Sequence, residues 1–247
     1  MASGSKLLSA LGGKFGILLI ALIVLLVASP ILVERPTRSI VLVLFGEAVL
    51  VASLHAARPG GRPVVIGLIL SLIDFAIGRL VLFDSALWLC YLQAILWLVT
   101  LVYVAVTILQ SIFESRKVSM ETLQASLCVY LLLGLIWVFL YAIVELTAPG
   151  SFVSSDPSGV VARGDASQRS QFMRLVVFSY STMVCTGYGD LIPANGFANM
   201  CASLQAMTGQ VYLAVVIARL VGIQSNQSLS EQTARAVETA VVLENES

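Results

Sequence analysis

The chain has 247 residues, of which 58% are hydrophobic and 11% are charged, and its mean hydropathy is +0.95. Soluble domains carry about 25% charged residues, so this composition indicates a protein that lies in a bilayer. The formal net charge is zero, so there is no electrostatic case for a nucleic-acid partner, which would need a basic patch to replace phosphate counterions. The cysteines show no paired spacing, which argues against a disulfide framework and against a metal site.

Six apolar runs lie between charge clusters, and each is long enough for a membrane-spanning helix of about 20 residues. They cover residues 15–33, 39–57, 64–83, 86–113, 123–147 and 197–223. The sequence therefore predicts an all-α membrane protein with six transmembrane helices.

Basic residues in the short loops predict how the spans are oriented. The first apolar run is followed by no small-residue cleavage site, so we interpret it as a retained helix. With the N-terminus inside, the basic residues divide into a cytoplasmic set (Lys6, Lys14, Arg58, Arg62, Arg116, Lys117 and Arg235) and an outer set (Arg35, Arg38, Arg163 and Arg169). We expect a multi-pass protein of the inner (plasma) membrane, surrounded by lipid, with both termini cytoplasmic.

The chain divides into two membrane modules and a tail. Residues 1–117 hold four spans with very short connections, such as 34–38 and 58–63, which favour a compact antiparallel bundle. Residues 118–223 hold the last two spans and a polar stretch, 149–170, typical of an extracellular loop. Residues 224–247 form a short cytoplasmic tail, in which Ser228 and Glu231 match a capping box that would begin a new helix.

The second module also contains a half-length apolar segment, residues 171–183, followed by a glycine-rich turn. At 1.5 Å per residue such a helix is about 20 Å long, too short to cross the bilayer. It must enter the membrane and return. Non-helical backbone at membrane depth is tolerated where it is buried in protein or lines a watery cavity, so the segment suggests a pore.

The turn reads Cys185-Thr186-Gly187-Tyr188-Gly189. A potassium ion that enters a narrow pore exchanges its water for rings of backbone carbonyls. Successive carbonyls point at one axis when ordinary and left-handed dihedrals alternate, which is easiest at glycine. Gly187 and Gly189 occupy the alternating positions. The pattern predicts a selectivity filter at these five residues, with K⁺ bound at Cys185, Thr186, Gly187 and Tyr188.

A re-entrant helix, Thr-Gly-Tyr-Gly-Asp at 186–190 and a final span make residues 123–223 resemble the pore domain of the potassium channel superfamily. The resemblance implies a homotetramer with a central pore, passive K⁺ transport without enzymatic activity, and no cofactor beyond the permeant ion. It also implies that Asp190 braces the filter and that a glycine in the last helix, Gly209 here, acts as a gating hinge.

Two departures from that family affect the prediction. Cys185 stands where most members have Thr, and a thiol is a weak ligand for a hard cation. The Cys-x-Gly-Tyr-Gly pattern resembles pacemaker-type channels, so a weakly selective cation channel is the alternative. The pore-helix Trp that often braces the residue at Asp190 is absent, and Tyr180 or Ser181 is expected to replace it.

Six spans with the pore last also resemble voltage-gated channels. The predicted fourth span has no basic residue before Arg116, so the membrane field has almost no charge to act on and we expect little voltage gating. Charged residues do occur in spans two and three, where each needs a partner or water. We expect Glu47 to pair with Arg79, while Glu47 and Asp74 also resemble the acidic residues that face gating arginines.

The sequence leaves two rival functions open and disfavours a third. Gly187-Tyr188-Gly189-Asp190 also fits the Gly-x-Gly-Asp pattern of intramembrane aspartyl proteases, with Asp74 as the second carboxylate. A non-conducting subunit of a partner channel would carry the same filter. A transporter is disfavoured because no paired inverted repeats are visible. The sequence identifies no cytoplasmic regulator.

Overall fold

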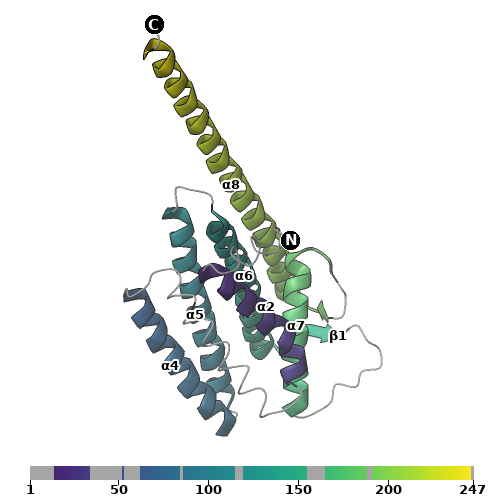
Figure 1. Ribbon diagram of the computed structural model, residues 1–247. Coiled ribbons are helices and arrows are strands. Elements are labelled where there is room, and N and C mark those ends of the chain that lie inside the picture. Colours follow the sequence, from purple (N-terminus) through teal and green to yellow (C-terminus); the bar gives the residue numbers. More distant parts are fainter. Residues whose placement is uncertain are drawn as a thin grey trace.

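The computed structural model describes residues 14–33, 52, 62–83, 86–114, 119–154, 165–187 and 191–245. Nearly all of the predicted second span, 39–57, lies outside these residues, and Glu47 with it. In chain order the elements are α2 (Lys14–Val33), α4 (Arg62–Phe83), α5 (Leu87–Glu114), α6 (Met120–Thr147), β1 (Phe152–Ser154), α7 (Asp165–Met183), β2 (Leu191–Pro193) and α8 (Gly196–Asn245). The described chain is mostly helical, as expected (Figure 1).

Four described helices are long and apolar enough to cross a membrane. They are α4, α5, α6 and the first part of α8, with apolar stretches at Val64–Val81, Leu87–Glu114, Met120–Thr147 and Gly196–Ile223. The apolar stretch described in α2, Lys14–Ala28, is shorter. Large apolar side chains cover the outside of these helices, including Val65, Ile69 and Leu72 of α4. Such a surface suits lipid rather than water, so the chain is an all-α, multi-pass membrane protein.

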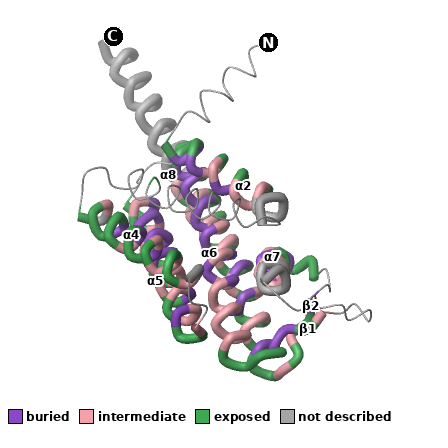
Figure 2. Tube along the Cα trace, turned by 90° about the horizontal axis from the view of Figure 1, so that it is seen from below, coloured by how far each residue is buried: buried purple, intermediate pink, exposed green. Residues whose placement is uncertain are grey.

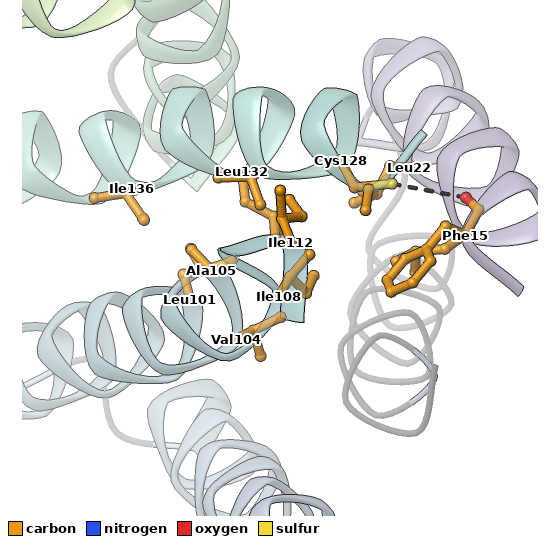
Figure 3. Close-up of a cluster of buried hydrophobic side chains, with 13 residues drawn as sticks. Phe15, Leu22, Leu101, Val104, Ala105, Ile108, Ile112, Cys128, Leu132 and Ile136 are labelled. Carbon is orange, nitrogen blue, oxygen red and sulfur yellow. Dashed lines mark hydrogen bonds between the residues drawn. The ribbon is translucent and has the colours of Figure 1, made fainter. Parts of the chain in front are cut away.

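The main core lies where α2, α5 and α6 meet. Its buried side chains are Phe15, Leu18 and Leu22 of α2, Leu101, Val104, Ala105, Ile108 and Ile112 of α5, and Ala125, Cys128, Val129, Leu132 and Ile136 of α6 (Figure 3). The Cys128 thiol lies 3.8 Å from the Phe15 carbonyl oxygen. Cys128 thus behaves as a small buried side chain, and all four cysteines are free.

Among the described elements, α2 packs mainly on a helix of the predicted second module, although its buried side chains also share a core with α5. Its main neighbour is α6, with a smaller contact to α7, whereas α4 packs on α5. Figure 2 shows α6 between these groups, with buried residues along much of its length. α6 begins where the Ser119 side chain accepts a hydrogen bond from the Thr122 amide, as an N-cap residue does.

Three features of the second half differ from the sequence-based expectation. α7 begins at Asp165 instead of residue 171, because the six residues 165–170 contain no glycine or proline. β1 and β2 form an antiparallel pair, with Phe152 opposite Pro193 and Ser154 opposite Leu191. α8 is one continuous helix of 50 residues, so the expected new helix at Ser228 is wrong. Its C-terminal half extends away from the other helices (Figure 1).

Candidate functional site

The candidate filter follows α7 directly. After Met183 the Cys185 amide donates to the Thr182 carbonyl at 3.0 Å, and the Thr186 amide donates to the Ser181 carbonyl at 2.8 Å. These two bonds form a Schellman motif, in which the residue after the helix cap adopts a left-handed conformation. That residue is Cys185, with φ 57°. Glycine is usual there, and a side chain costs about 1–2 kcal/mol.

Gly187 has the left-handed backbone predicted for it. Its φ is 61°, and its amide donates to the Ser181 carbonyl at 3.4 Å. A Cβ at Gly187 would have no atom within 4 Å, so the dihedral angle alone calls for glycine. Cys185, Thr186 and Gly187 are all exposed in the single chain. Tyr188, Gly189 and Asp190 lie outside the described residues.

Backbone pairing holds the two sides of this loop. β1, which follows α6, pairs with β2, which begins directly after Asp190. The pairing continues past the strands, because the Ala194 amide donates to the Ser151 carbonyl at 2.8 Å. Asn195 Nδ2 donates to Ser151 Oγ, also at 2.8 Å. The segment after the filter is thereby attached to the segment after α6.

Glu145, near the end of α6, organises the turn that leads into β1. Its Oε1 accepts from the Gly150 amide at 2.8 Å and from Gln171 Nε2 at 3.1 Å, and its Oε2 accepts from the Phe152 amide at 3.0 Å. The carboxylate therefore connects α6, the turn and α7. Sequence reasoning missed Glu145. The signal was an acidic residue just before the Pro149-Gly150 turn.

α7 lies against α6 through Gly134 and its neighbours. Ser179 Oγ donates to the Gly134 carbonyl at 2.7 Å, and Tyr180 Oη donates to the Leu131 carbonyl at 2.7 Å. A Cβ on Gly134 would lie 2.7 Å from Tyr180 Cζ, so the tyrosine ring fits only because residue 134 has no side chain. Tyr180 thus holds α7 against α6, and its role in supporting a filter, including a brace to Asp190, stays a prediction.

Ser181 supports the loop mainly through its backbone. Its hydroxyl donates to the Phe178 carbonyl at 3.0 Å, while its own carbonyl accepts from the Thr186 and Gly187 amides at 2.8 and 3.4 Å. The position of Ser181 in α7 thus determines where the first filter residues lie.

A buried aromatic cluster connects α6, β1 and α7. The rings of Tyr141, Phe152 and Phe178 lie edge to face, with centroid distances of 5.1, 5.3 and 5.5 Å. Such pairs contribute about 0.5–1.5 kcal/mol each beyond burial of their area. The cluster holds the C-terminal part of α7 against α6 and β1, and nothing in the local sequence marks its three members as neighbours.

α8 contacts α7 through Gln205 and Gly209. Gln205 is fully buried, and its Nε2 donates to the Ser179 carbonyl at 2.9 Å and to Ser179 Oγ at 2.7 Å. Its Oε1 accepts from Tyr141 Oη. Sequence reasoning missed Gln205, whose only signal was a polar residue within an apolar span.

Gly209 allows α8 to approach the end of α7. A Cβ at this position would lie 2.7 Å from the Met183 carbonyl oxygen. The next residue, Gln210, reaches the candidate filter, with Nε2 3.6 Å from Cys185 Sγ. Close approach explains why glycine occurs here. The hinge role stays a prediction, since α8 is helical on both sides of Gly209.

Asp74 lies in a different part of the fold. It is buried in α4, and its Oδ2 accepts from Thr100 Oγ1 of α5 at 2.8 Å. The only neighbour with which α4 packs extensively among the described elements is α5. Asp190 lies outside the described residues, so the pairing of Asp74 with Asp190 stays a prediction. Arg79 is exposed, with its guanidinium 5.7 Å from the centre of the Phe75 ring. Its expected partner, Glu47, lies outside the described residues.

Comparison with known proteins adds no assignment. No protein-family model matches the chain, and no curated protein and no solved structure matches it.

Proposed function

We propose that this chain is one subunit of a homotetrameric channel that conducts potassium passively through a backbone-carbonyl filter at residues 185–189. The observation that carries the proposal is the loop after α7. There a Schellman motif turns the chain and Cys185 and Gly187 adopt φ 57° and 61°. Left-handed residues at alternate positions are what a row of convergent carbonyls requires. The same residues would hold K⁺, and the ion is the substrate rather than a resident cofactor.

The electrostatics of α7 favour a cation at its end. The C-terminus of a helix carries partial negative charge because the dipoles of its peptide units are aligned. α7 ends at Met183, two residues before the filter. No charged side chain is needed for this effect, because the backbone supplies both the partial charge and the ligands.

Two surfaces that are exposed in the single chain support assembly of several copies around an axis. The filter residues Cys185 to Gly187 are exposed. α8 also exposes an apolar stripe at alternating spacings of three and four, formed by Phe197, Met200, Leu204, Met207 and Val211. This is the spacing of a helix face that packs on another helix. One chain supplies only one member of each carbonyl ring, so conduction requires further copies.

The proposed channel is also expected to open with little dependence on the membrane voltage. α5, Leu87–Glu114, carries one charged residue, Glu114, at its last position. Moving a charge through 100 mV supplies about 2.3 kcal/mol, and a helix without charges inside the membrane gains almost nothing from the field.

A weakly selective cation channel is the second candidate, and Cys185 favours it. Its exposed thiol stands next to Gln210 at the inner end of the filter and offers sulfur in place of a hydroxyl. A soft sulfur is a poor ligand for K⁺, so the innermost ion site would rest on backbone oxygens alone.

The test is the reversal potential of the purified chain in planar bilayers, with K⁺ on one side and Na⁺ on the other. A value at the K⁺ equilibrium limit supports the selective channel, and robust current with a value near zero supports the weakly selective one. Gly187→Ala is the loss-of-function control and Gly222→Ala the matched control, since a Cβ at Gly222 would have no atom within 4 Å. Absence of current from protein that is folded and tetrameric would refute both candidates.

A further inference from the structure

α8 and α7 meet at two levels that are one helical turn apart in both helices. Gln205 contacts Ser179, and Gly209 contacts Met183, so each step of four residues in α8 matches a step of four in α7. Residues four apart lie on one face of a helix. The contact is therefore an aligned face, and a shift of α8 along its axis would disturb both levels together.

The Gln205 amide uses all its hydrogen-bonding groups within this face. Nε2 donates to the Ser179 carbonyl and to Ser179 Oγ, and Oε1 accepts from Tyr141 Oη. Ser179 Oγ in turn donates to the Gly134 carbonyl. Because no water lies in the bilayer core, a Gln205 amide that left these partners would lose its hydrogen bonds without replacement. α6, α7 and α8 are thus joined through one buried side chain.

A short backbone path leads from this amide to the candidate filter. Two residues beyond Ser179, the Ser181 carbonyl accepts from the Thr186 and Gly187 amides. A helix is stiff over so short a distance, so the position of Ser179 determines the position of Ser181. The filter residues then follow.

We propose that Gln205 is a residue through which α8 positions the candidate filter, beside the direct contact of Gln210 with Cys185, so that movement of the last helix is transmitted to the ion path by the Gln205–Ser179 hydrogen bonds. The effect on ion flux rests on the proposed function. The effect of Gln205 on the position of residues 185–187 does not. Gln205 is a positioning residue, since it touches Ser179 rather than the filter residues themselves.

Cys185 provides a built-in reporter of filter position. Its thiol is exposed, while Cys90 on α5 is half-buried and serves as an internal reference. The experiment measures the alkylation rate of each cysteine by mass spectrometry in the reconstituted protein. Loss of an interhelical hydrogen bond in a membrane typically changes an equilibrium by about three-fold, and at most by about eighteen-fold. Gln205→Leu is therefore expected to raise the Cys185 rate about three-fold or more relative to Cys90.

Two further variants separate positioning from general loosening. Thr208→Val is the matched control on α8, because the Thr208 hydroxyl donates to the Leu204 carbonyl of its own helix, and its Cys185 rate should equal that of the wild type. Ser179→Ala removes one acceptor of Gln205. In that background Gln205→Leu should add less to the rate than it adds in the wild type, since the two residues act as a pair.

Equal Cys185 rates in wild type and Gln205→Leu would overturn the proposal. If Gln205→Leu does not yield monodisperse protein, Gln205→Asn, whose amide is one methylene too short to reach Ser179, carries the same expectation and the same refutation. In bilayers, Gln205→Leu should also change the K⁺ to Na⁺ permeability ratio while Thr208→Val does not. A silent wild type would defeat the proposed function and leave the Cys185 result to decide on positioning. A conducting wild type with unchanged rates would defeat the inference alone.

Discussion

Gly134→Ala tests whether α7 is held against α6 in the way the structure shows. The new methyl group would lie 2.7 Å from Tyr180 Cζ and 3.0 Å from Cδ1, and closer still to Cε1. The ring cannot move away freely, because Tyr180 Oη donates to the Leu131 carbonyl and the adjacent Ser179 donates to the Gly134 carbonyl. Either α7 shifts as a whole or these hydrogen bonds break.

The magnitude follows from two opposing contributions. Overpacking of this kind costs about 1–3 kcal/mol, and the two interhelical hydrogen bonds contribute about 0.6 kcal/mol each on average. Against this, alanine is favoured over glycine within a helix by about 1 kcal/mol. The expected net loss is about 1–3 kcal/mol in the free energy of unfolding.

The assay is unfolding by SDS titration in mixed micelles, followed by circular dichroism. Gly222→Ala of α8, where no atom lies within 4 Å of the new Cβ, is the matched control and should be neutral or slightly stabilising. In the double variant Gly134→Ala/Tyr180→Leu, the smaller side chain should recover part of the loss, which a double-mutant cycle measures as coupling. If Gly134→Ala and Gly222→Ala unfold alike, the close packing of Tyr180 on Gly134 is wrong.

Three further predictions concern the filter and its neighbours. Gly187→Ala should abolish selective current while folding is kept, because its φ of 61° costs a side chain about 1–2 kcal/mol; an unchanged reversal potential would contradict the filter assignment. Cys185→Thr should raise the preference for K⁺ by supplying a hydroxyl, but a β-branched residue at φ 57° is strained, so Cys185→Ser should give a similar change in permeability ratio with better stability. Gly209→Ala should separate α8 from α7, because the new methyl group meets the Met183 carbonyl oxygen at 2.7 Å; a lower open probability in single-channel recordings is expected, and currents equal to those of Gly222→Ala would exclude this contact as a gating element.

Much of the membrane topology and the existence of the loop followed from local patterns. An apolar run of about 20 residues predicts a spanning helix without knowledge of its neighbours, and α4, α5, α6 and the first part of α8 confirm four of the six expected. The left-handed backbone at Gly187 was likewise predictable, because glycine lacks the Cβ that makes this conformation costly. Both properties are set by the residue or the run itself.

The ends and joins of elements were less predictable. The capping box at Ser228 was outweighed because residues 224–245 contain no glycine or proline to stop α8. β1 and β2 have three residues each and are defined by their pairing. Strands this short have no periodicity that a sequence pattern can detect. The left-handed Cys185 was also unexpected, because the helix ending imposes it on a residue that does not favour it.

The side-chain contacts that support the candidate filter depend on the tertiary structure alone. Gln205 reaches Ser179 across 26 positions of the chain, Tyr141 reaches Gln205 across 64, and Ser179 reaches Gly134 across 45. In the sequence these are a glutamine, a tyrosine, a serine and a glycine within apolar helices, each compatible with many environments. The sequence determines which segments enter the bilayer, because transfer of a segment from water depends on its own side chains. The partners of each buried polar group depend on how the helices pack, because every such group must find its hydrogen bonds on a neighbouring helix.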